Sequence, residues 1–137
     1  MTLYIIGIGL WDEKDISVKA LEIVKKCDVV YLESYTSTLS ITAEQLGKFY
    51  GKSVKPLFRI DVEQGEQKIL DEAKEQDVAF LVIGDAFSAT THMSLFMEAK
   101  KQDIPVHVIH NASVLTAIGI VGLELYKFGR VASIPFH

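Results

Sequence analysis

Three short segments directly after apolar runs contain glycine, an acidic or amide side chain, or a hydroxyl group, and such residues could bind a small polar ligand. The segments begin at Gly7 (GIGLW), Gly84 (GDAFS) and His110 (HNASV). Glycine lets the backbone approach a ligand closely, and a carboxylate such as Asp85 can contact a cationic or polar group. If the preceding runs are parallel strands, all three segments open at the carboxyl edge of one sheet, where such sheets bind ligands. We therefore expect one shared crevice.

The glycines of the first segment allow three interpretations. Gly7-Ile8-Gly9 starts like a dinucleotide-binding fingerprint, but position 12, where the third glycine should stand, is Asp. The alternatives are a tight turn that needs positive φ, or a close backbone approach to a ligand without phosphate. The residues alone leave these alternatives open.

The central segment also has a structural interpretation. Asp85 could cap the next helix as readily as it could contact a ligand. Thr90, Thr91 and His92 could be helix-capping hydroxyls and an exposed histidine. The G-x-S-x-G elbow of a hydrolase is absent around Ser88, and the sequence contains neither a metal-binding set nor a Walker A motif.

Composition narrows the class of protein. The chain has 137 residues, of which 49% are hydrophobic and 23% charged, as in an ordinary soluble globular domain. The net charge of −4 and the scattered lysines disfavour a nucleic-acid partner. The single cysteine, Cys27, can form neither an internal disulfide nor a thiolate zinc cluster. Because the sequence shows no signal peptide and no membrane span, we expect a cytoplasmic protein without a membrane partner.

The apolar pattern predicts strands that alternate with helices. Such an alternation is typical of an α/β fold with a mostly parallel, doubly wound sheet and helices on both faces. We expect one domain over residues 1–137. The expected strands are 3–8, 29–32, 54–58, 78–83 and 105–109, and the expected helices are 16–26, 42–50, 67–75 and 90–101.

The last quarter of the chain is harder to interpret. Residues 113–125 are apolar almost throughout, which predicts a helix packed against neighbours on most sides. Residues 131–134 resemble a last strand. Since no helix follows that strand, we expect either a trimmed domain or a further part of the parent protein.

With these motifs in hand, the sequence resembles the diphthine synthases, methyltransferases of the tetrapyrrole-methylase fold. The resemblance lies in residues 3–37 (LYIIGIGL to SYTS), 84–95 (GDAFSATTHMSL) and 110–130 (HNASVLTA to KFGR). It implies an enzyme that uses S-adenosyl-L-methionine, with S-adenosyl-L-homocysteine as product, to methylate the amino group of a modified histidine on translation elongation factor 2 during diphthamide biosynthesis. It also implies a homodimer. The cofactor contacts that it implies are Leu10, Asp85, Ser88, Ser113 and Val114.

The sequence departs from the family in two respects. The family has proline after Gly-Asp in the central segment, where this chain has Ala86. The family's second α/β domain, which forms the other wall of the cofactor cleft, is absent from these 137 residues. We therefore expect the amino-terminal half of such an enzyme, which binds cofactor weakly and is inactive alone.

The resemblance leaves the catalytic base open. Methyl transfer from a sulfonium needs positioning more than acid chemistry, but an amine acceptor must first lose a proton. Candidates near the crevice are Asp12, Glu13, Asp15 and Glu33, and all four could equally be solvated loop charges. Tyr35 could face a methylated ammonium through its ring.

Two other functions remain open at the sequence level. One is another methyltransferase of the same fold, acting on a porphyrin-like ring or on ribosomal RNA. The other is a non-catalytic nucleotide-binding domain that uses the crevice for a regulatory ligand.

Overall fold

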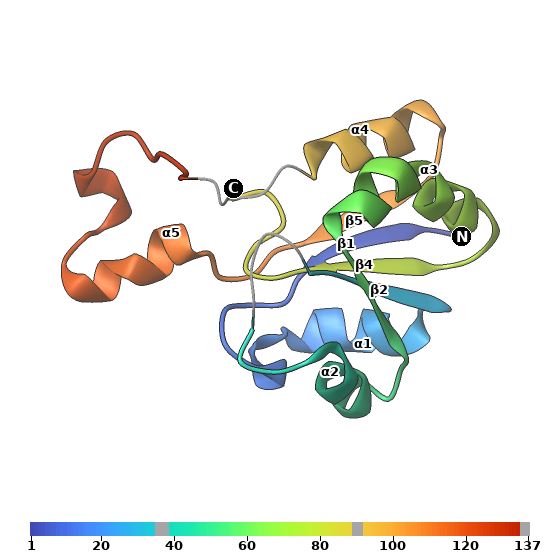
Figure 1. Cartoon of the computed structure of the whole chain (residues 1–137), viewed down its shortest axis with the longest axis horizontal. Helices are drawn as coiled ribbons and strands as arrows, with labels where there is room; N and C mark the ends of the chain where they lie inside the picture. Colours follow the sequence, from blue (N-terminus) through green and yellow to red (C-terminus); the bar gives the residue numbers. More distant parts are fainter. Residues whose placement is uncertain (35–38, 89–91, 135–137) are drawn as a thin grey trace.

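The computed structural model describes residues 1–34, 39–88 and 92–134 and contains one parallel five-stranded sheet. The strand order is β3-β2-β4-β1-β5, and every neighbouring pair is parallel. β1, β4 and β5 therefore lie side by side, with β1 between the other two (Figure 1). The strands are β1 (Leu3–Gly7), β2 (Val29–Glu33), β3 (Val54–Leu57), β4 (Val78–Val82) and β5 (Val106–Ile109).

Four helices cover the two faces of the sheet. α1 (Val18–Lys26) and α2 (Ala43–Tyr50) lie on one face, and α3 (Arg59–Glu75) and α4 (Met93–Lys101) lie on the other (Figure 1). The predicted doubly wound α/β fold is confirmed.

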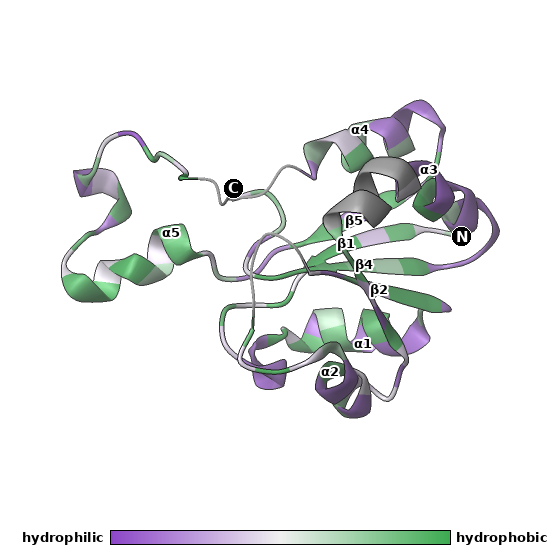
Figure 2. Cartoon of the chain, viewed as in Figure 1, coloured by the Kyte–Doolittle hydropathy of each residue, from purple (hydrophilic) through white to green (hydrophobic). Residues whose placement is uncertain are grey.

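Strand β4 shows why the sheet needs helices on both faces. All five of its residues are buried. Val78, Phe80 and Val82 belong to the apolar cluster under α3 and α4, whereas Ala79 and Leu81 belong to the cluster over α1 and α2. Successive side chains of a strand point to opposite faces, so an uninterrupted apolar run requires apolar cover on both. In Figure 2, β4 is coloured in shades of green along its length, as expected for such an apolar run.

Local signals fix the helix ends on the α1 and α2 face. Ser17 precedes α1 and accepts a hydrogen bond from the N–H of Ala20 at 3.1 Å. Thr42 and Gln45 form a capping box at the start of α2, and Gly51 ends that helix in the left-handed region. α1 begins two residues after its predicted start and α2 one residue after, because Ser17 and Thr42 act as the caps.

The starts of α3 and α4 differ most from the prediction. α3 begins at Arg59, well before residue 67. Gly65 and the charged residues before it weaken the helix signal in the sequence, which explains the late predicted start. α4 begins at Met93, while residues 90 and 91 of its predicted start lie outside the described part of the chain.

The predicted long buried helix at residues 113–125 is wrong. α5 covers only Val114–Ala117, followed by 3-10 turns at Ile118–Val121 and Leu125–Lys127. We call residues 114–134 the apolar tail. Ile120 is 91% exposed, and the tail extends away from the sheet (Figure 1). A helix is stabilised mainly by packing, and this apolar segment has little to pack against. Gly122, at a φ of 84°, ends the 3-10 turn Ile118–Val121.

The predicted strand at 131–134 does not form, because the tail does not return to the sheet. Within the described residues, no helix is long and apolar enough to cross a membrane.

Candidate functional site

Two glycine turns at the carboxyl edge of the sheet are bonded directly to each other. Gly9 and Gly84 have φ angles of 84° and 80°, a region that favours glycine. The N–H of Gly84 donates to the Gly9 carbonyl oxygen at 2.7 Å, and the N–H of Gly9 donates to the Gly84 carbonyl oxygen at 3.3 Å. A Cβ on Gly7 would lie 2.6 Å from that same Gly84 oxygen. The turns after β1 and β4 therefore approach each other too closely for a larger residue at position 7.

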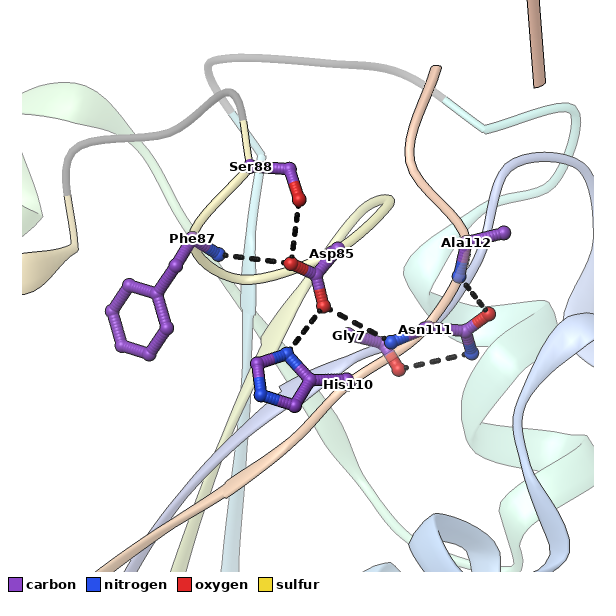
Figure 3. Close-up of polar contacts among 7 residues, drawn as sticks. All are labelled: Gly7, Asp85, Phe87, Ser88, His110, Asn111 and Ala112. Atoms are coloured by element: carbon purple, nitrogen blue, oxygen red, sulfur yellow. Dashed lines mark hydrogen bonds and ion pairs between the residues drawn. The ribbon is translucent and has the colours of Figure 1, made fainter. Parts of the chain in front are cut away.

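The carboxylate of Asp85 joins the turn after β4 to the turn after β5 (Figure 3). Its Oδ2 accepts hydrogen bonds from Ser88 Oγ at 2.7 Å and from the N–H of Phe87 at 3.4 Å. Its Oδ1 accepts one from the N–H of Asn111 at 3.1 Å and lies 2.9 Å from His110 Nδ1. Asp85 thus shapes its own turn and also holds the neighbouring one.

These contacts keep Asp85 ionised. Burial raises the pKa of the Asp85 carboxyl, since only 8% of the residue is exposed, but the four contacts just described together hold it below the usual value. Hydrogen bonds to the charged form of a carboxylate stabilise that form. The site therefore carries a fixed negative charge at neutral pH.

Asn111 completes the connection between the three turns. Its Nδ2 donates to the Gly7 carbonyl oxygen at 3.2 Å and to the Asp15 carbonyl oxygen at 3.0 Å, and its Oδ1 accepts from the N–H of Ala112 at 2.7 Å. Figure 3 shows the bridge from Asn111 to Gly7 beside the contacts of Asp85. The predicted convergence of the segments at Gly7, Gly84 and His110 is confirmed.

The five predicted cofactor contacts lie on these turns or directly after them. Leu10 packs beside Gly84, since its Cδ2 lies 3.6 Å from the position of a Cβ on that glycine. Ser88 is bonded to Asp85. Ser113 is buried and accepts from the N–H of Leu115 at 3.2 Å, and Val114, about half exposed, begins α5.

Two of the three acidic residues of the first loop have structural partners. Asp12 and Asp15 form a capping box around the 3-10 turn Glu13–Asp15. Asp15 Oδ2 also accepts from the N–H of Trp11 at 2.8 Å. The carboxylates of Asp12 and Asp15 therefore hold the loop after β1 in shape. Tyr35, the proposed aromatic contact, lies outside the described residues.

A buried ionisable pair lies at the same edge of the sheet. His92 is only 3% exposed, so the expectation of an exposed histidine is wrong. Its Nε2 lies 3.9 Å from Oε2 of Glu33, the last residue of β2, and its ring packs edge-on to Phe80 with centroids 5.1 Å apart. Glu33 is fully buried, so it is not a solvated loop charge.

The buried polar residues of the described chain all lie at this edge. They are Glu33, Asp85, His92 and Ser113. Sequence reasoning did not find His110 and Asn111 as partners of Asp85. The available signal was a pair of polar residues directly after an apolar run, at the sheet edge where the strand before Asp85 also ends.

Comparison with known proteins identifies the family of this chain. A model of the tetrapyrrole (corrin/porphyrin) methylases matches residues 2–135. Diphthine methyl ester synthase of Homo sapiens is 54% identical over 134 residues, which are 98% of this chain and 47% of the human protein. The protein of the same name from Saccharomyces cerevisiae is 51% identical over 135 residues, which are 98% of this chain and 45% of that protein.

Solved structures agree with these relatives. A crystal structure of diphthine synthase superposes with a TM-score of 0.90 at 44% identity, over 94% of this chain and 52% of that one. A putative diphthine synthase from Entamoeba histolytica has a TM-score of 0.83 at 50% identity, over 94% of this chain and 48% of that one. The chain spans about half the length of the curated relatives it matches. The family model and the fold agree, and the chain belongs to the tetrapyrrole methylase family.

Proposed function

We propose that this chain is the cofactor-binding part of an S-adenosyl-L-methionine-dependent methyltransferase that methylates the amino group of the modified histidine of elongation factor 2. The observation that carries the proposal is the hydrogen-bonded junction of the three turns around Asp85. The relatives named diphthine methyl ester synthase support the choice of substrate.

The residues at the junction suit a cationic nucleoside. Gly9 and Gly84 let the turns after β1 and β4 meet without side chains between them, and Leu10 supplies an apolar surface beside Gly84. Asp85 places a negative charge at the edge, which favours a sulfonium or ammonium group. A carboxylate has about four acceptor positions, and Asp85 already has four partners. Asp85 therefore acts on the cofactor through its charge, its backbone and the shape of its turn, and Ser113 and Val114 provide contacts from the third turn.

S-adenosyl-L-methionine supplies a methyl group whose bond to sulfur breaks as the acceptor nitrogen attacks, with the bonding electrons kept by sulfur. The chain contributes mainly positioning, because displacement in line needs a short and aligned approach. The amine nitrogen can attack only after it has lost its proton to water or to a carboxylate, because the proton occupies its lone pair. Asp12 and Asp15 are engaged in capping the first loop, which favours water as that acceptor.

The name diphthine methyl ester synthase, which the relatives carry, favours a second acceptor. A methyl ester forms when a carboxylate oxygen, not a nitrogen, receives the methyl group. A carboxylate is ionised at neutral pH and needs no base. Transfer to oxygen would use the same cofactor site, and the two products differ in stability because esters hydrolyse in mild alkali.

The proposal includes the setting of the chain. The 137 residues form the amino-terminal half of a cytoplasmic homodimeric enzyme whose second domain supplies the other wall of the cleft. The 137-residue chain alone therefore binds cofactor weakly and does not turn over.

The experiment measures transfer of labelled methyl groups from S-adenosyl-L-methionine to elongation factor 2 that carries the unmethylated modified histidine. The enzyme is the polypeptide extended to the length of its relatives, and elongation factor 2 with that histidine replaced is the control. Label that resists mild alkali indicates nitrogen, and label released as methanol indicates an ester. Absence of label from the histidine-containing factor contradicts the proposal.

A further inference from the structure

A cavity of about 320 Å³ lies at the other end of the same sheet edge, beside the ends of β2, β3 and β4. Its apolar wall is formed by Leu32, Leu39, Ile41, Phe58 and Ile83. Ile83 directly precedes the Gly84 turn in the chain. The cavity therefore lies directly beside the turn that follows β4.

The polar groups of this cavity are hydroxyls. Thr42 Oγ1 caps α2 by accepting a hydrogen bond from the N–H of Gln45 at 3.2 Å, so this hydroxyl is already engaged. Ser34 Oγ donates to the Leu32 carbonyl oxygen at 3.4 Å, which leaves its lone pairs as acceptors. None of the described residues that line the cavity is charged. Because an unpaired charge is costly in such surroundings, the cavity suits a neutral, flat group with one N–H donor.

The wall of the cavity is tied to the first cofactor turn. Ser40, between Leu39 and Ile41, donates to the Trp11 carbonyl oxygen from its N–H at 3.2 Å and from its Oγ at 2.7 Å. Trp11 directly follows Leu10, and its own N–H is held by Asp15. The position of the wall is thus fixed relative to the turn after β1.

A larger hollow elsewhere does not share these features. It measures about 640 Å³ and lies along α2 and the edge strand β3, lined in part by Glu44, Lys48 and Lys52. Its lining includes no residue of the three cofactor turns. Size alone therefore does not identify the acceptor position.

We propose that the 320 Å³ cavity holds the imidazole ring of the methyl acceptor, the modified histidine side chain, with Ser34 accepting its N–H. This inference rests on the proposed function. The polar junction at β1, β4 and β5 holds the cofactor, and the apolar end at β2 and β3 holds the ring beside it. Binding of the ring in a shaped cavity brings the acceptor group to the methyl group in a fixed orientation.

The test fills the cavity in the polypeptide extended to the length of its relatives. Leu39→Trp adds volume within the cavity, and Phe49→Trp adds the same ring at an exposed site on α2 that lines neither hollow. We expect Leu39→Trp to raise the KM for elongation factor 2 at least tenfold, with the Kd for S-adenosyl-L-homocysteine within twofold of wild type. Phe49→Trp should change neither quantity.

A second variant protects the test against misfolding. Ser34→Ala removes the acceptor hydroxyl without adding volume, and the loss of one hydrogen bond predicts an increase of roughly three- to tenfold in KM alone. If Leu39→Trp instead weakens the binding of S-adenosyl-L-homocysteine, the cavity holds the adenine base of the cofactor and the inference is wrong. Unchanged KM in both variants also overturns it. A wild-type protein that transfers no methyl group would overturn the proposed function itself, an outcome distinct from either.

Discussion

The body of the domain, residues 1–113, and the apolar tail are both rich in hydrophobic residues, but those of the body are largely buried and those of the tail are exposed. In the body, apolar runs alternate into two clusters, one on each face of the sheet. In the tail, Ile120, Leu123 and Tyr126 are each at least half exposed. A hydrophobic pattern indicates which residues favour burial, but it does not identify the surface that covers them. The body supplies its own cover, and we expect the tail to be covered by another domain.

The largest expected difference between the two regions is thiol reactivity. Cys27 is 1% exposed, and burial, with smaller contributions from Asp77 and Asp28, raises the pKa of its thiol to about 11. Because the thiolate is the reactive form, Cys27 should react at least about 100-fold more slowly with a disulfide reagent at pH 7.5 than an ordinary exposed thiol. Ile120→Cys, combined with Cys27→Ala, provides the matched tail thiol and should react at the ordinary rate. Similar rates for the two thiols would remove the distinction between body and tail.

Substitution of Asp85 should produce the largest loss of stability. Asp85→Ala removes the acceptor of several hydrogen bonds that join two turns, so we expect a loss of about 2–4 kcal/mol in the free energy of unfolding. Urea denaturation measures this loss. Asp85→Asn keeps the shape but not the charge and should lose less, whereas a fully stable Asp85→Ala would show that the turns hold together without it.

Acidification should reveal the same carboxylate. Its pKa is lowered in the folded protein, so its contribution to stability is complete above the unfolded value of about 3.9 and is lost as pH falls through the lower folded value. Stability should therefore fall with decreasing pH in this acid range, with a shallower slope in Asp85→Asn. Equal slopes for the two proteins would assign the acid sensitivity to other groups.

A matched pair of glycine substitutions sharpens the comparison. Gly7→Ala would place a Cβ 2.6 Å from the Gly84 carbonyl oxygen, and we expect a destabilisation of about 1–3 kcal/mol. Gly119→Ala in the tail meets no described atom within 4 Å and should change stability by less than about 0.5 kcal/mol. Thermal denaturation of both variants is the measurement, and equal losses would contradict the assignment.

The smallest effect is expected for Ile120→Ser in the 137-residue chain. Because Ile120 is exposed there, its replacement should change the free energy of unfolding by less than about 0.5 kcal/mol. In the polypeptide extended to the length of its relatives, the same change should cost about 2 kcal/mol or more, since a buried aliphatic group would be lost. Equal small effects in both proteins would mean that the tail is not covered.

The sequence was sufficient for the features that depend on local chemistry and strand alternation. The parallel sheet follows from buried apolar runs such as β4, and the caps at Ser17 and Thr42 follow from residue type. The meeting of the three turns also follows, because parallel strands place their carboxyl ends at one edge.

Other features depended on contacts between distant residues. The burial of His92 requires Glu33 and Phe80, which precede it by many residues. Asn111 reaches Gly7 and Asp15 because the sheet places β5 beside β1. The conformation and burial of the tail depend on the surface that covers it, which the hydrophobic pattern of residues 114–134 does not specify.

Isothermal titration of S-adenosyl-L-homocysteine into the extended polypeptide, beside its Asp85→Ala variant, tests the cofactor site most directly. We expect saturable binding with one ligand per chain in the wild type, and an affinity at least about 100-fold weaker in the variant, or some 2.7 kcal/mol. Absence of heat in the folded wild type, or equal affinity in the two proteins, would contradict a cofactor site built on the junction of these three turns.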